Sequence, residues 1–265
     1  MPAPCVQLFV TCLVDLLYPE VGERTVALLE RLGCEVAFPS AQTCCGQPAL
    51  SSGYPRDAVK VADRFLDAFA DTEGPIVAPF GSCVHMVRHH YARLYDGERA
   101  TVAAGLAARI HDLPSFIVDE LGRPAVGGRY PGRAGTAVAY HHECHMRYGL
   151  GVTKAPMSLL RGVAGCTIVE PARGELCCGF GGTFSLKLGD VAVAMADEKL
   201  DSALAAGAQA IVSTDVGCLM HLEGRARRRE LPLRVPHLVD LLEPDGRLLS
   251  GPLTRPRPRT REANE

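Results

Sequence analysis

The sequence predicts an α/β protein made of two pseudo-symmetric halves, each built around a small parallel sheet. Apolar strand patterns alternate with amphipathic helix patterns, and the same order occurs twice along the chain. A set of four cysteines also occurs twice, and matching members are separated by about 132 to 135 residues. Alternating strands and helices favour a parallel sheet with right-handed crossovers. We therefore expect two Rossmann-like halves.

The first half, residues 1–125, is predicted to hold three strands. They are the apolar runs at 6–10, 35–38 and 76–78. A helix pattern between the first two runs ends at Gly33, which is a typical helix stop. A second helix pattern covers 58–69. This order gives two strand–helix–strand units that share the middle strand.

The second half, residues 134–250, repeats that order. Its strand patterns lie at 137–140, 167–170 and 211–213, and its helix patterns lie around Leu159 and over 193–204. A junction rich in glycine and proline, at 122–135, separates the halves. Residues 251–265 alternate Arg and Pro, which predicts a disordered tail.

Each repeated cysteine follows one of the predicted strands. The loops after parallel strands all emerge at the carboxyl edge of the sheet, where open α/β sheets bind their ligands. We therefore expect the four cysteines of each half to converge at one edge and to bind one group per half. The first quartet is Cys12, Cys44, Cys45 and Cys83, and the second quartet is Cys144, Cys177, Cys178 and Cys218.

Four thiolates can ligate an iron–sulfur cluster or a tetrahedral zinc ion. A reactive dithiol that exchanges disulfides is the third candidate. Structural zinc sites and dithiol oxidoreductases usually contain Cys-x-x-Cys, and neither quartet contains it. Gly46 and Gly179 lie beside adjacent cysteines and permit close backbone approach to a bulky anionic cluster. This pattern favours a cluster and leaves zinc open.

The composition gives no indication of nucleic-acid binding or of membrane insertion. The net charge is −2, and the chain has no tryptophan, so neither a nucleic-acid surface nor a base-stacking platform is indicated. No apolar run reaches the length of a membrane span, and the first residues do not have the pattern of a signal peptide. Eleven cysteines in such a chain predict a cytoplasmic protein that binds a metal, with no stable membrane insertion.

The doubled Cys-Cys-Gly pattern resembles that of the cysteine-rich CCG domain proteins. These include the cysteine-rich component of heterodisulfide reductase and the iron–sulfur component of glycolate oxidase, and the chain is most similar to the lactate-utilization branch. The resemblance covers roughly residues 6–243. It rests on the segments 11–15, 18–22, 42–48, 81–83, 89–91, 177–184 and 217–220.

The resemblance implies an iron–sulfur electron-transfer subunit of a complex that oxidises L-lactate to pyruvate. Its cofactors would be one or two clusters, of the 4Fe-4S type, with zinc as an option in the N-terminal half. Its partners would be a ferredoxin-like iron–sulfur protein and a third lactate-utilization subunit. The alternatives are a zinc-stabilised scaffold and a redox subunit like those of glycolate oxidase or heterodisulfide reductase.

The chain departs from the reductase members, whose motif ends in Cys-x-x-Cys and supplies a fifth thiolate. At the corresponding positions it has Met86 and His221, which we retain as extra candidate ligands. Six histidines also lie near the quartets, and we expect hydrogen bonding to the ligands from them more than ligation. They are His85, His89, His90, His141, His142 and His145.

Overall fold

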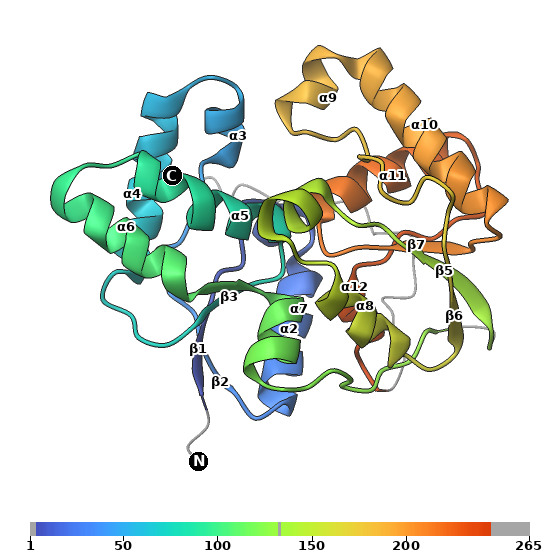
Figure 1. Ribbon diagram of the computed structural model, residues 1–265, viewed down its shortest axis with the longest axis horizontal. Coiled ribbons are helices and arrows are strands. Elements are labelled where there is room, and N and C mark those ends of the chain that lie inside the picture. The colour runs from blue at the N-terminus through green and yellow to red at the C-terminus, as the bar shows by residue number, and fades with distance from the viewer. Residues whose placement is uncertain (1–3, 132–133, 245–265) are drawn as a thin grey trace, which may run out of the picture.

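The computed structural model describes residues 4–131 and 134–244, and it contains two parallel sheets (Figure 1). The strand order is β2-β1-β3-β4 in the first sheet and β6-β5-β7 in the second. Every strand pair within the two sheets is parallel. The predicted α/β class with two similar halves is therefore confirmed.

The first half alternates strands and helices as the apolar periodicity predicts. Its elements are β1 (Cys5–Leu8), α1 (Cys12–Leu17), α2 (Pro19–Arg31), β2 (Glu35–Ala37), α3 (Gln47–Ser51), α4 (Pro55–Phe69), β3 (Ile76–Ala78), α5 (Gly81–His90), η1 (Tyr91–Arg93), α6 (Gly97–Arg109), β4 (Ile110–Asp112), α7 (Leu113–Ser115) and η2 (Phe116–Glu120).

The second half repeats this order with fewer elements. They are β5 (Thr136–Tyr140), η3 (His145–Leu150), α8 (Lys154–Arg161), β6 (Cys166–Val169), α9 (Thr183–Lys187), α10 (Gly189–Ala205), β7 (Ala210–Val212), α11 (Val216–Arg228) and α12 (Leu238–Leu241).

The first sheet has a fourth strand, β4, that the sequence patterns do not predict. It is three residues long and mixes apolar with polar residues, so it carries no usable apolar period. The second sheet has only isolated parallel bridges at the corresponding place, at Arg234 and His237. The sequence patterns also do not predict the helices α5 and α11, because each begins within a cysteine motif.

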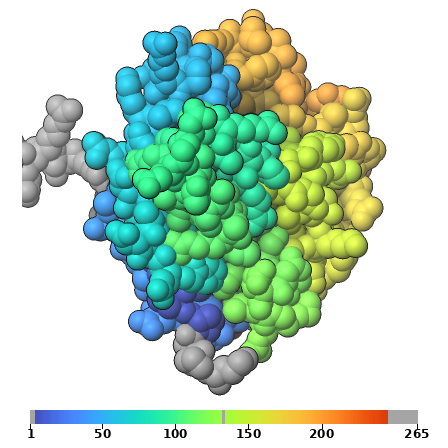
Figure 2. Space-filling model, turned by 60° about the vertical axis from the view of Figure 1, so that its left-hand side comes forward, coloured from blue at the N-terminus to red at the C-terminus, as the bar shows by residue number. Residues whose placement is uncertain are grey.

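The two halves share one hydrophobic core. It contains Leu28 of α2, Leu159 of α8 and Leu241 of α12, all fully buried. In Figure 1 these helices lie between the two sheets, and Figure 2 shows the halves meeting in one continuous surface. An ion pair of 2.7 Å between Arg24 and Asp240 crosses the same region. The two predicted repeats therefore form a single packed body.

No helix within the described part of the chain is long and apolar enough to cross a membrane. The predicted disordered tail at 251–265, and the end of the predicted second repeat at 245–250, lie outside the described residues. The exact repeat boundaries at 125 and 134 stay predictions.

Candidate metal centres

The first quartet is assembled at the carboxyl edge of the first sheet, as the topology predicts. Cys12 is the first residue of α1, directly after β1 and the tight turn at Thr11, where φ is 70°. Cys44 and Cys45 lie in the loop that follows β2, and Cys83 lies in the first turn of α5, which follows β3. β1 lies between β2 and β3, so three neighbouring strands deliver the four thiols to one point.

Gly46 makes the sharp turn that places the two adjacent cysteines. Its φ is +84°, and a Cβ there would lie 3.0 Å from the carbonyl oxygen of Ala58 in α4. A side chain at this position would be strained by the backbone and by the neighbouring helix. The Cys-Cys-Gly motif is therefore a turn packed against a helix, which fixes the direction of both thiols.

The four thiols of the first quartet form a chain of contacts. The Sγ atoms of Cys45 and Cys83 are 3.3 Å apart. Cys44 is hydrogen-bonded to Cys12 on one side and to Cys45 on the other. The quartet therefore gathers all four sulfur donors at one point.

One thiol of the first quartet is acidic. Hydrogen bonds from the thiols of Cys12 and Cys45, with help from the backbone N–H of Gly46, lower the pKa of Cys44 to about 3. The bond to Cys44 and burial raise the pKa of Cys12, and contacts with Cys44 and Cys83 raise that of Cys45. A single thiolate surrounded by thiol donors is an arrangement that a metal ion can enter by displacing protons.

The second quartet has the same construction around β5, β6 and β7. Cys144 directly precedes η3, Cys177 and Cys178 lie in the loop after β6, and Cys218 lies in the first turn of α11. The Sγ atoms of Cys178 and Cys218 are 2.9 Å apart, and Cys177 is hydrogen-bonded to both Cys144 and Cys178. Gly179 has a φ of +89°, and a Cβ there would lie 2.6 Å from the carbonyl oxygen of Ala192.

Cys177 is the acidic thiol of the second quartet. Hydrogen bonds from Cys144 and Cys178 lower its pKa to about 2, with a smaller contribution from the backbone N–H of Gly179 at 3.4 Å. The backbone N–H of Phe180 also lies 3.4 Å from the sulfur of Cys178. Backbone N–H groups therefore point at the sulfurs, as they do around anionic centres.

A buried lysine lies close to the second quartet, and sequence reasoning missed it. Lys199 of α10 is 4% exposed, and burial lowers its pKa to about 8 although the thiols of the quartet act in the opposite direction. Its Nζ donates to the carbonyl oxygens of Gly174 (2.5 Å) and Leu176 (2.8 Å), in the loop before Cys177. On the helical pattern Lys199 lies with the apolar residues of α10, which is the signal that could have found it.

The two quartets face each other across the boundary between the halves. The hydroxyl of Ser82, next to Cys83, donates to Asp215 Oδ2 at 2.7 Å, and Asp215 Oδ1 accepts from the backbone N–H of Cys218 at 3.0 Å. A second bridge joins Gln47 to His145 at 2.8 Å. Residues beside the two quartets are therefore hydrogen-bonded to each other across the boundary between the halves.

The extra candidate ligands are placed differently from each other. Met86 is fully buried in the core shared by the halves. The ring nitrogen Nε2 of His221 lies 3.2 Å from the carbonyl oxygen of Ala192 in α10, so that nitrogen already has a partner. Ligation by either residue stays a prediction. His141 instead joins Cys178 and Cys218 in a group whose donor atoms all lie within 4.8 Å of one another.

The donor sets fit a thiophilic metal or an iron–sulfur cluster. Four sulfurs converge in each half, and the backbone N–H groups of the glycine turns point at cysteine sulfurs, as expected around a sulfur-rich anion. All eleven cysteines lie in the described residues, and none forms a disulfide. Each quartet would hold its group through its four thiolates.

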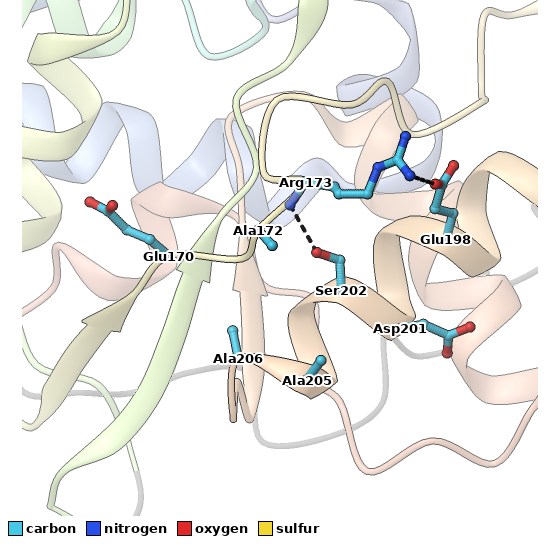
Figure 3. A pocket seen from close by; sticks show the side chains of 8 residues that line it. All are labelled: Glu170, Ala172, Arg173, Glu198, Asp201, Ser202, Ala205 and Ala206. Atoms are coloured by element: carbon cyan, nitrogen blue, oxygen red, sulfur yellow. Dashed lines mark hydrogen bonds and ion pairs between the residues drawn. The ribbon is translucent and has the colours of Figure 1, made fainter.

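One surface pocket lies away from both quartets, between the end of β6 and α10 (Figure 3). Its lining includes the acidic residues Glu170 and Asp201. Arg173 forms an ion pair of 2.6 Å with Glu198, and its backbone N–H donates to Ser202 (Figure 3). Asp201 is likewise paired, with Arg229 at 2.7 Å, so most of the charge that lines this pocket is neutralised within the protein.

Comparison with known proteins agrees with this geometry. The model of the cysteine-rich CCG domain matches residues 6–88 and 138–223, one match in each half. Lactate utilization protein A of an Exiguobacterium species is 46% identical over 242 residues, covering 90% of this chain and 97% of the relative. The chain belongs to the lactate utilization protein A family.

Two further lactate utilization proteins A extend the comparison. That of Geobacillus kaustophilus is 46% identical over 239 residues, and that of Bacillus subtilis is 44% identical over the same length. Each alignment covers 89% of this chain and 98% of the relative. Both CCG matches contain a complete quartet, so the family's two domains coincide with the two assembled sites.

Proposed function

We propose that this protein is an iron–sulfur electron-transfer subunit that serves lactate utilization in the cytoplasm. The observation that carries the proposal is the pair of complete thiol quartets. Two sulfurs lie 3.3 Å apart within the first quartet and 2.9 Å apart within the second. A hydrogen bond between Ser82 and Asp215 links the two sites. An iron–sulfur cluster supplies one-electron storage at such thiolates. Family membership points to lactate as the source of the electrons.

The chain's own residues would hold and shield the bound groups. Cys45, Cys83, Cys178 and Cys218 are buried, whereas the other four cysteines are partly exposed. Each site therefore has a protected side toward the core and an open side toward the surface. The open side would allow electrons to reach a docked partner, for which we propose a ferredoxin-like iron–sulfur protein and a third lactate-utilization subunit.

The two sites have different surroundings, and we keep zinc in the first quartet with a cluster in the second as the alternative arrangement. Around the first quartet the neighbouring core is aromatic, with Phe9 and Phe65 at 4.8 Å between ring centroids. Around the second it contains the cation of Lys199.

The decisive experiment is metal and acid-labile sulfide analysis of anaerobically purified protein, with visible spectra before and after dithionite. Iron with matching sulfide and an absorption band that bleaches on reduction supports the electron-transfer role. Zinc in both sites, without visible absorption, overturns it and favours the zinc-stabilised scaffold. One zinc with one cluster supports the mixed arrangement.

Substrate and pathway need a separate test. Lactate should bleach the visible band only when the two proposed partner proteins are both present, because this chain is not expected to bind lactate itself. Glycolate in place of lactate is the control for the glycolate oxidase alternative. Bleaching by lactate with this protein alone would contradict a pure carrier role, and cleavage of a disulfide substrate by it would favour the reductase alternative.

A further inference from the structure

The most unusual side chain outside the two quartets is His141, at the end of β5. Its backbone N–H donates to the carbonyl oxygen of Val212 at 2.8 Å, which continues the sheet. Its side chain is 1% exposed. Within residues 4–131 and 134–244, neither Nδ1 nor Nε2 has a hydrogen-bond partner.

A buried imidazole without partners is costly. A polar group that loses its water on folding and gains no hydrogen bond destabilises the folded state. Buried polar side chains in native proteins nearly always have a partner, so each exception calls for one that the chain itself does not supply. Water, a metal and a bound cluster are the candidates.

The position of the ring discriminates among these candidates. A ring nitrogen of His141 and the sulfurs of Cys178 and Cys218 all lie within 4.8 Å of one another. In a thiolate–imidazole metal site the metal lies about 2.3 Å from sulfur and about 2.0–2.1 Å from nitrogen. Donor atoms around one metal are therefore separated by roughly 3.5–4 Å. The ring nitrogen of His141 therefore lies within about 1 Å of the separation from the two sulfurs that a shared metal requires.

The first half provides an internal control for this position. Phe9 occupies the equivalent place at the end of β1, since its backbone N–H donates to Val77 at 2.9 Å in the same register. Phe9 packs on Phe65 of α4. The first half therefore fills this place with a purely apolar ring.

The residue that packs beside this ring also differs between the two halves. Gly46 faces Ala58 of α4, and Gly179 faces Ala192 of α10, so the two helices are in register. In this register Phe65 corresponds to Lys199. An aromatic pair beside the first quartet is thus replaced beside the second quartet by an imidazole and an ammonium group.

We propose that His141 is a fifth ligand of the second site, where an imidazole nitrogen binds the metal or cluster iron held by the second quartet. The proposal rests on the proposed function only in requiring that this quartet holds a metal.

The two sites then differ in kind. The first site is held by cysteines alone, and the second by cysteines with one imidazole.

The test is pulsed electron paramagnetic resonance on reduced protein labelled with ¹⁵N-histidine. We expect a ¹⁵N hyperfine coupling of directly bound nitrogen in the wild-type protein. His141→Phe, which installs the residue that the first half uses at this place, should abolish the coupling. His142→Phe is the matched control, because the neighbouring ring packs on Tyr140 with centroids 4.8 Å apart, and it should retain the coupling.

The outcomes separate the two proposals. A wild-type protein that contains iron but shows no bound nitrogen overturns the ligand role. A coupling that survives in His141→Phe also overturns it. If His141→Phe does not fold, His141→Gln serves as the second variant. If the metal is zinc, the proposed electron transfer fails, and X-ray absorption then tests His141 by the nitrogen donors lost from the variant.

Discussion

Ser82 and Asp215 are joined by a hydrogen bond of 2.7 Å that links the two cysteine quartets. Ser82 directly precedes Cys83, and Asp215 caps the backbone N–H of Cys218 through its other carboxylate oxygen at 3.0 Å. Glu143, beside Cys144, is buried at the same boundary, accepts from Thr214 at 2.6 Å and has its pKa raised mainly by burial. The contact between the halves is therefore polar where the sites meet, although the shared core around it is apolar.

Ser82→Ala should destabilise the protein by about 1–3 kcal/mol, because it leaves a buried carboxylate oxygen of Asp215 without its donor. The measurement is the urea midpoint of the fully loaded protein. Ser51→Ala is the matched control, since Ser51 is exposed and bonds only to the carbonyl of Gln47 within its own helix, α3. It should change the free energy of unfolding by no more than about 0.5 kcal/mol. Equal effects of the two variants would show that the bond between halves contributes nothing.

Cys178→Ser should remove the group from the second site and leave the first, with the fold retained. The serine oxygen is a poor donor for a thiophilic metal, and the change in side-chain volume is small. Iron content and visible absorbance should fall by roughly half if both sites hold clusters. Cys45→Ser should do the same to the first site.

Cys5→Ser is the control for these variants, because Cys5 is exposed and lies outside both quartets. It should leave the metal content and the spectrum unchanged. A Cys178→Ser protein that is folded and has the full spectrum of the wild type would contradict the assignment of the second quartet as ligands.

Lys199→Met should lower the reduction potential of the second site. A buried cation stabilises the reduced, more negative form of a nearby cluster, and its loss is worth on the order of 1–2 kcal/mol. For a one-electron couple this is roughly 40–90 mV. Potentiometric titration of the two sites gives the measurement, and the first site should not shift.

Lys199 also donates to Gly174 and Leu176, so a structural effect of its loss has to be separated from the effect of its charge. Lys199→Arg retains the charge and should retain most of the potential. If Lys199→Met and Lys199→Arg shift the potential equally, the loop and not the charge sets it.

Acid should weaken the fold through His237. Its ring accepts from the backbone N–H of Val239 at 3.1 Å, and its Nε2 lies 3.0 Å from the carbonyl oxygen of Pro79 and 3.2 Å from that of Thr214. Burial lowers its pKa below the ordinary value of about 6.5. The unfolded chain therefore binds this proton more readily than the folded one, so stability is full above about pH 6.5 and falls as the pH drops through the folded pKa.

The measurement is the difference in urea midpoint between the wild type and His237→Gln at pH 7.5 and at pH 5.5. The difference should shrink at the lower pH, because only the wild type carries the histidine that must stay neutral. Asp240, whose pKa is raised mainly by burial, changes stability in the opposite direction, and that burial is present in both proteins. A difference that does not vary with pH would exclude His237 as the titrating group.

Much of the fold and of the candidate sites follows from the sequence alone. Apolar periodicity locates the strands β1, β2, β3, β5, β6 and β7 and the helices between them, because each must bury one face against its neighbours. The repeated cysteines, together with the rule that loops of parallel strands share an edge, predict both quartets, which the structure brings together. Gly46 and Gly179 are visible in the sequence as part of the Cys-Cys-Gly motifs.

Only the tertiary structure decides how the two sites differ and how they meet. The correspondence of Phe9 with His141, the burial of Lys199 and the bond from Ser82 to Asp215 depend on atoms brought together from distant segments. Local patterns report which face of an element is apolar, but they do not report which polar side chain is buried without a partner. That property belongs to the packed chain, because desolvation is set by all neighbours in space and not by neighbours in sequence.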